Sequence, residues 1–278
     1  MTQSPGGGPA MCNDDVPAPV KSRPRSPLTF FMLVFVLSIP FWWIGGMTDL
    51  QLMLGLSVSA LMAFCPMAAA LILVHREDKT AGMTNLLKRS FDFKRIKSKR
   101  WFALSLLLMP SVSVAMYGLM RWMDLPVPAP QFSWFAALLM FLAFFVGALG
   151  EELGWSGYVL DPLQDRWTAI KASVVLGVVG IVWHLMPLVL LHRSPAWIGW
   201  WCVYAVAARI LMVWLYNNTG QSVFAVALFH ATLNLAYMLF PVNGSHFDIR
   251  LGGLVMAFVA AVVTLVWGPR TLARYQRA

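Results

Sequence analysis

Long runs of apolar residues without a charged side chain are the dominant feature of this sequence. The first, residues 28–47, contains no Asp, Glu, Lys or Arg, and comparable runs recur as far as residue 267. About 20 apolar residues in a row are enough for a helix to cross the hydrocarbon core of a bilayer. With 59% hydrophobic and only 12% charged residues, the chain cannot cover a folded surface with polar groups. A soluble enzyme or a nucleic-acid-binding domain is therefore excluded, despite the net charge of +9.

Eight segments have the length and composition of membrane spans. They are residues 28–47, 52–74, 101–120, 133–152, 172–191, 197–216, 221–240 and 251–267. The fold class that follows is an all-α integral membrane protein, with one transmembrane domain over residues 28–267. Residues 1–27 are rich in Pro, Gly and Ser and predict a disordered tail. Residues 268–278 predict a short basic tail.

The basic residues predict the orientation of these spans. An even number of spans places both termini on one side of the membrane. Seventeen of the 21 Lys and Arg residues fall on that side, three fall on the other, and Arg209 lies inside a span. Because Lys and Arg are enriched in cytoplasmic loops, we expect both termini in the cytoplasm and the protein in a bacterial inner membrane. The segment 75–100 predicts a basic helix lying on the inner leaflet, in contact with membrane lipid, and we interpret its charge as a topology signal.

Tryptophan residues occur near several of the expected span ends. Aromatic side chains with one polar atom favour the boundary between lipid and water. The sequence therefore predicts aromatic belts at the two membrane surfaces. The tryptophans concerned are Trp42, Trp43, Trp122, Trp200, Trp201 and Trp267.

Several polar side chains fall inside the expected spans. An ionisable residue within a span costs roughly 2.5–3.5 kcal/mol on insertion scales, so it indicates a functional role. Two carboxylates close the fourth span, and the fifth, sixth and seventh spans each carry an ionisable residue, followed in the seventh by an amide. These residues are Glu151, Glu152, His184, Arg209, His230 and Asn234. Together they predict one polar site within the membrane.

Helix geometry restricts how these side chains meet. His230 and Asn234 are four residues apart and project from one helix face. At about 1.5 Å per residue, His184 lies about 18 Å and His230 about 14 Å from the cytoplasmic start of its span, so their depths are compatible. Glu151 and Glu152 are adjacent and project about 100° apart. One glutamate is therefore expected to face the reacting centre and the other to orient a neighbour.

A carboxylate, two imidazoles and an amide are the groups that hydrolysis of a peptide bond by water requires. Glu or His removes a proton from water, while a second His and the Asn amide donate hydrogen bonds to the developing oxyanion. One carboxylate and two imidazoles with an open position also describe a catalytic zinc site, in which Glu151, His184 and His230 would be the ligands. The residues alone therefore leave the cofactor open between none and Zn²⁺.

The same residues resemble the motifs of a known family. The stretch 151–158, EELGWSGY, resembles the E-E-x-x-x-R signature of the CAAX protease and bacteriocin-processing (CPBP) family of intramembrane proteases, in particular its type II CAAX prenyl endopeptidases. Trp183 and His184, shortly before Pro187, are similar to the second motif of that family. His230-x-x-x-Asn234 is similar to the third. The resemblance covers about residues 133–240.

The resemblance implies eight helices around a polar cavity that opens toward the cytoplasm. It implies endoproteolysis of membrane-associated protein or peptide substrates, including prenylated CAAX chains, by either a glutamate-type or a metal-dependent mechanism. Carried over to this chain, Glu151 and His184 would activate the water. His230 and Asn234 would stabilise the oxyanion.

One position departs from the family pattern. Ser156 stands where the E-E-x-x-x-R signature has its arginine. In the signature that arginine lies one helical turn after the second glutamate and can pair with it. We hypothesise that Arg209 takes over as the partner of Glu152.

Two other functions fit the same residues. A non-catalytic family member, acting in bacteriocin immunity or as a membrane scaffold, is favoured by Ser156. A proton-coupled transporter could use the Glu and His side chains as a relay. Substitution of Glu151 or His184 would separate these functions, because only a protease would lose a cleaved product.

Overall fold

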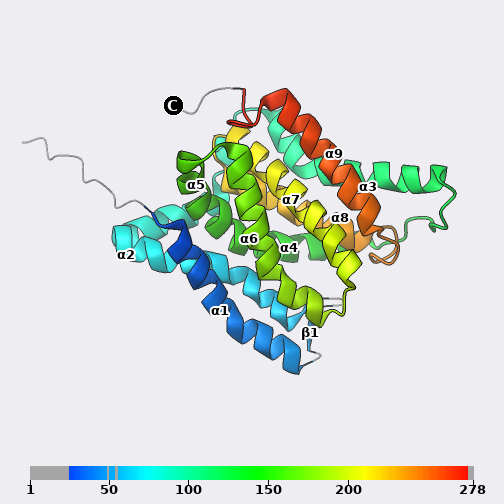
Figure 1. Cartoon of the computed structure of the whole chain (residues 1–278), viewed down its shortest axis with the longest axis horizontal. Coiled ribbons are helices and arrows are strands. Elements are labelled where there is room, and N and C mark those ends of the chain that lie inside the picture. The colour runs from blue at the N-terminus through cyan, green and yellow to red at the C-terminus, as the bar shows by residue number, and fades with distance from the viewer. Residues whose placement is uncertain (1–24, 49, 54–55, 275–278) are drawn as a thin grey trace, which may run out of the picture.

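A computed structural model of the chain describes residues 25–48, 50–53 and 56–274 (Figure 1). Within these ranges the chain forms a bundle of helices with one short β-hairpin. The helices are α1 (Pro27–Met47), α2 (Cys65–Lys88), α3 (Lys99–Trp122), α4 (Trp134–Gly154), α5 (Leu160–Arg166), α6 (Ala169–Leu190), α7 (Pro195–Asn218), α8 (Val223–Leu239) and α9 (Ile249–Trp267). The hairpin is β1 (Gln51–Met53) and β2 (Leu56–Ser57), and 3-10 turns lie at Val58–Phe64, Arg89–Phe91 and Phe93–Arg95.

The helices confirm the expected all-α integral membrane fold. In the described part of the chain, seven helical stretches are long and apolar enough to cross a membrane. The eighth expected span is the shorter apolar helix α8, with 17 residues. Ser, Thr or Asp side chains cap the first turns of most of these helices, as Ser194 does for α7 and Asp248 for α9.

The second expected span begins differently from the prediction of 52–74. The hairpin occupies residues 51–57, and the helical stretch runs from Val58 to Phe91. Ser57 caps this stretch by accepting a hydrogen bond from the Ser59 amide. Beyond residue 74 the helical stretch continues through charged residues to Lys88, with a kink at Lys79, so the first half of the helix predicted for 75–100 belongs to α2.

The fourth span is also longer than the predicted 133–152. A π-helical turn, Trp155–Val159, joins α4 to α5 and carries the helical stretch on to Arg166. The helical stretch does not end at the glutamates because all five residues of the turn are buried in the core. The two glutamates therefore lie in the middle of a long helix and not at its end. Such π-turns occur frequently at functional sites.

Glycines allow α4 to pack closely against the start of α2. A Cβ atom at Gly150 would lie 2.9 Å from the carbonyl oxygen of Ala63, and one at Gly154 would overlap the backbone of Pro66. This Gly-x-x-x-Gly spacing brings backbones together as in other membrane helix pairs. The close approach fixes the segment of α4 that carries the glutamates.

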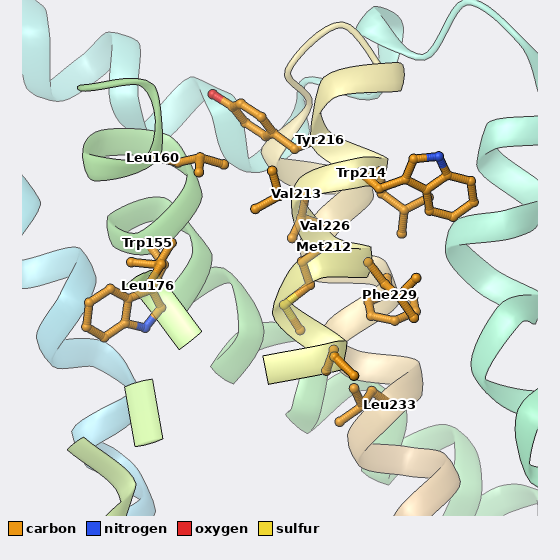
Figure 2. Close-up of a cluster of buried hydrophobic side chains, with 14 of the residues drawn as sticks. Trp155, Leu160, Leu176, Met212, Val213, Trp214, Tyr216, Val226, Phe229 and Leu233 are labelled. Atoms are coloured by element: carbon orange, nitrogen blue, oxygen red, sulfur yellow. The ribbon is translucent and has the colours of Figure 1, made fainter. Parts of the chain in front are cut away.

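The buried core fills the space between the π-turn and helices α6, α7 and α8. Figure 2 shows its side chains meeting from these elements. The labelled members are Trp155, Leu160, Leu176, Met212, Val213, Trp214, Tyr216, Val226, Phe229 and Leu233. This apolar packing lies beside the polar residues of α4, α6, α7 and α8 and closes the bundle around them.

The bundle has two ends that differ in charge. We call one the hairpin end: it holds β1, β2 and the connections 123–133, 191–194 and 240–248, and Gln131 N–H donates to Pro241 across it. We call the other the basic end: it holds residues 25–27, 89–98, 166–168, 219–222 and 268–274. There the predicted tail is fixed rather than free, because Asn218 donates to the Leu272 carbonyl and Leu272 is fully buried. Residues 1–24 and 275–278 of the two predicted tails lie outside the described residues.

Substitution of Gly154 by alanine is expected to destabilise the protein by about 1–3 kcal/mol, the usual range for overpacking a tight contact. The added methyl group would meet the Pro66 backbone, which cannot rotate away as a side chain can. Thermal unfolding in detergent measures the effect. Gly118→Ala in α3 is the matched control, because nothing lies within 4 Å of a Cβ atom there. Equal unfolding temperatures for both variants would contradict the close packing of α4 on α2.

Candidate active site

Glu152 is the most deeply buried charged residue of the site, with no exposed surface. Arg209 Nη1 lies 3.0 Å from its Oε2 atom, and the Ser156 hydroxyl donates to the same oxygen. The other oxygen, Oε1, lies 3.1 Å from Nδ1 of His230. A buried carboxylate is tolerated only when it is paired and hydrogen-bonded. These three partners, from α7, the π-turn and α8, meet that requirement.

Arg209 forms with Glu152 the ion pair that the hypothesis of a replacement for the signature arginine requires. Ser156, which stands in place of the signature arginine, also binds Glu152 through its hydroxyl. Ser156 thus keeps a hydrogen bond to Glu152 at the signature position, while the positive charge comes from Arg209 on a different helix. The sequence indicated this ion pair because it places an arginine inside an apolar span.

The contact with Glu152 determines how His230 presents its ring. A carboxylate paired with Arg209 can only accept a hydrogen bond, so Nδ1 of His230 carries the hydrogen. In the neutral ring the second nitrogen, Nε2, is then an acceptor. His230 can donate from Nε2 only as an imidazolium, with Glu152 as its counter-charge.

His184 is held by its own helix and by two tryptophans. Its Nδ1 atom lies 2.8 Å from the Gly180 carbonyl, which can only accept, so the neutral ring again has its lone pair on Nε2. The ring packs edge-on against Trp183, with 4.7 Å between centroids, and at 5.5 Å from Trp201. Trp201 was expected in an aromatic belt. It lies instead against a histidine of the site, a role that its position near a span end could not indicate.

Glu151 has a different environment from its neighbour. It is 8% exposed, and its carboxylate forms no hydrogen bond or ion pair with the other described residues. It lines the same cavity as His184 and His230. The two glutamates therefore divide as the 100° offset predicts, with Glu152 orienting its neighbours and Glu151 facing open space.

Two cavities meet at these side chains. The smaller, about 120 Å³, is lined by the catalytic candidates of α4, α6 and α8 together with Arg209. The larger, about 420 Å³, shares Glu151, His184 and Asn234 with it. A single water molecule needs only about 10–15 Å³ of such space. The polar residues predicted from sequence thus surround space that can hold water and part of a substrate.

The larger cavity leads toward the hairpin end of the bundle. Its lining continues from His184 to Leu190 at the end of α6, and to Thr48 and Ser57 beside the hairpin. Residues 25–27 and 268–274, the described residues nearest the two termini, lie at the other end. Two expectations from the sequence, termini in the cytoplasm and a cavity open to the cytoplasm, therefore cannot both hold.

The zinc alternative requires three side chains that converge on one point. Among the described residues, no group of three or more His, Cys, Asp or Glu side chains lies close enough together to hold a metal ion. Glu151, His184 and His230 surround a shared cavity, but they do not form a ligand cluster. The arrangement present does not fit the zinc site that the residue types allowed.

A further pair of residues positions the helices of the site from the basic end. The Arg89 guanidinium donates to the Gly157 carbonyl in the π-turn and to the Tyr216 hydroxyl at 2.7 and 2.8 Å. The Asp92 carboxylate accepts hydrogen bonds from the Val223 and Phe224 amides at the start of α8. The segment 89–92 therefore joins the two helices that carry the glutamates and His230. Its charge, which the sequence suggests as a topology signal, thus also serves to position these helices.

Removal of the Arg209 side chain is expected to destabilise the protein by about 3–5 kcal/mol, because it leaves the Glu152 charge buried without its cation. Arg209→Ala should lower the unfolding temperature in detergent. The double variant Arg209→Ala with Ser156→Arg should recover part of the loss, because it returns the arginine to the signature position. An unchanged unfolding temperature for Arg209→Ala would contradict the role of the ion pair.

Comparison with known proteins bears on the same part of the chain. Residues 132–236 match the family model described as type II CAAX prenyl endopeptidase Rce1-like. The chain is also similar to the CAAX prenyl protease 2 of Methanococcus maripaludis, with 26% identity over 267 residues, covering 88% of this chain and 96% of that protein. The matched range contains both glutamates, Ser156, both histidines, Arg209 and Asn234. Over residues 132–236 the chain is therefore similar to type II CAAX prenyl endopeptidases of the Rce1-like family.

Proposed function

We propose that the protein is an intramembrane endopeptidase that hydrolyses a peptide bond of membrane-associated protein substrates with a water molecule activated at Glu151. The observation that carries this proposal is the Glu151 carboxylate at the junction of the two cavities, beside His184 and without a partner among the described residues. A carboxylate in that position is free to bind water. Its neighbour Glu152 is occupied by Arg209 and His230.

In the first step Glu151 removes a proton from water, and the resulting hydroxide oxygen attacks the carbonyl carbon of the peptide bond. The Nε2 lone pair of His184 accepts a hydrogen bond from the same water and orients it. A positioned general base of this kind contributes about 10²–10⁴-fold to the rate. The smaller cavity provides the space for this water.

The tetrahedral intermediate carries a negative charge on the former carbonyl oxygen. The Asn234 amide and the His230 Nε2–H group donate hydrogen bonds to it. His230 does so as an imidazolium, stabilised by the Glu152 carboxylate at Nδ1. Collapse of the intermediate breaks the C–N bond, and the proton held by Glu151 passes to the leaving amine.

The proposed cofactor requirement is none, because the described side chains provide a base and two oxyanion donors but no ligand cluster. The proposed location is the cell membrane, with both termini in the cytoplasm. The excess of Lys and Arg on the side of the termini supports this orientation. Prenylated CAAX-type chains are the proposed model substrate, since the family description and the archaeal relative both carry that name.

Replacement of Glu151 by glutamine is expected to lower the rate of peptide cleavage by at least about 10²-fold, because the amide cannot take up a proton. Cleavage of a prenylated C-a-a-X peptide by purified protein measures the rate. Asp165→Asn in α5 is the control, because Asp165 is an exposed carboxylate that lines neither cavity. Similar rates for wild type and Glu151→Gln would rule out Glu151 as the base, and a wild type without activity would contradict the protease function.

Chelation tests the metal-free form of the mechanism. Cleavage of the same peptide should continue at an unchanged rate after incubation of the protein with a strong zinc chelator and removal of the chelate by gel filtration. The reason is that the proposed proton transfers use only side chains. Loss of activity that returns when zinc is added back would contradict the proposal and favour the zinc alternative.

A further inference from the structure

The larger cavity defines the direction from which the site is reached. It extends from Glu151 and Asn234, along Pro187 and Leu190 of α6, to Thr48 next to the hairpin. Thr48 is exposed, and it lies one residue beyond the end of α1. His184 lies six residues, or about 9 Å, from the end of α6 at Leu190 and about 22 Å from its start. The path through the cavity to the hairpin end is therefore short.

The opposite direction is closed by packed side chains. The π-turn below the glutamates is fully buried, and Trp155 and Tyr158 are each only 1% exposed. Leu176 and Met212, members of the core in Figure 2, form the lining of the smaller cavity toward the basic end. Among the described residues, neither cavity is lined by the segments 89–98, 166–168, 219–222 or 268–274.

Charge separates the two ends as clearly as the cavity does. Fourteen of the described Lys and Arg residues belong to the segments of the basic end, to the charged part of α2 that leads to it, or to the first turns of α3 and α6. Three lie at the hairpin end, namely Arg121, Arg193 and Arg250. Such an excess marks the cytoplasmic side of a membrane protein. The basic end therefore faces the cytoplasm, and the cavity opens on the other side.

We infer that the substrate peptide reaches Glu151 through the hairpin end, from the extracytoplasmic face of the membrane. The substrate class is then membrane-anchored polypeptides whose cleavable segment lies just outside the membrane. This inference rests on the proposed endopeptidase function. It differs from the cytoplasmic opening that the family resemblance implied, since in this chain the opening and the basic end are at opposite ends of the bundle.

The width of the cavity agrees with an extended chain as occupant. Small side chains line its middle part, and they come from α1, the 3-10 turn after the hairpin, and α4. They are Gly45, Ala60, Ala63, Ala143, Gly147 and Ala148. Nothing lies within 4 Å of a Cβ atom at Gly147, so a larger residue there would occupy the cavity without displacing neighbouring atoms.

Gly147→Phe should therefore lower cleavage of the C-a-a-X peptide at least tenfold at an unchanged unfolding temperature. Gly118→Phe, at a similarly open position on α3, should leave both unchanged, and full activity of Gly147→Phe would overturn the proposed path.

Cysteine labelling tests the orientation independently of catalysis. Thr48→Cys at the cavity mouth and Lys94→Cys at the basic end are each made in a Cys12→Ser background, which leaves two native cysteines, both within helices. A membrane-impermeant maleimide added to intact spheroplasts should label Thr48→Cys at least tenfold more than Lys94→Cys, and permeabilisation should equalise the two. The reverse order, or equal labelling before permeabilisation, would overturn the inference.

Two single-span reporters complete the test. Both reporters carry the same cleavable segment. In the first it lies on the extracytoplasmic flank of the membrane anchor, and in the second on the cytoplasmic flank. Cleavage of the first at least tenfold faster than the second is expected. Preferential cleavage of the cytoplasmic reporter would overturn the inference while supporting the proposed protease function. Failure to cleave either reporter, in cells that contain the labelled, folded protein, would overturn both.

Discussion

The structure depends on one buried charge, the carboxylate of Glu152. Taken out of water without partners, such a group would lose several kcal/mol of solvation, so the fold must bring donors to it. Arg209, Ser156 and His230 supply them from three different elements. These contacts join α4, α7 and α8 inside the membrane and fix the orientation of the His230 ring. The same contacts leave Glu151, on the adjacent face of α4, free to meet the cavity.

Close backbone packing and contacts at the basic end fix the helices that carry this network. Gly150 and Gly154 bring α4 against the start of α2, and the buried π-turn continues the helix past the glutamates. At the basic end, Arg89 binds the π-turn while Asp92 caps α8. The residues that hold the site are therefore partly charged groups outside the apolar spans. Their contacts close the basic end of the site, so the open path runs toward the hairpin.

The sequence predicted the parts of this molecule that follow from hydropathy and from charges inside apolar runs. The eight helical regions and the cluster of polar residues came from those two patterns, while the Arg209–Glu152 pair was expected from the departure of Ser156 from the family signature. The hairpin at 51–57 and the helix that continues to Arg166 could not be predicted, because apolar composition is the same in a span, a turn and a buried core. The roles of Trp201, Arg89 and Asp92 depend on contacts between distant segments. The direction of the cavity depends on which side chains pack between the glutamates and the basic end, and no local sequence pattern indicates that packing.

We propose that Glu151 serves the reacting water while Glu152 holds His230 in place. An experimental structure of the protein bound to a peptide with a tetrahedral phosphinate in place of the cleaved bond would test these two roles together. We expect one phosphinate oxygen within hydrogen-bond distance of His230 Nε2 and Asn234, the other beside Glu151, and the Glu152–Arg209 pair unbroken. A phosphinate bound to Glu152, or one coordinated through a metal ion by Glu151 and both histidines, would contradict it.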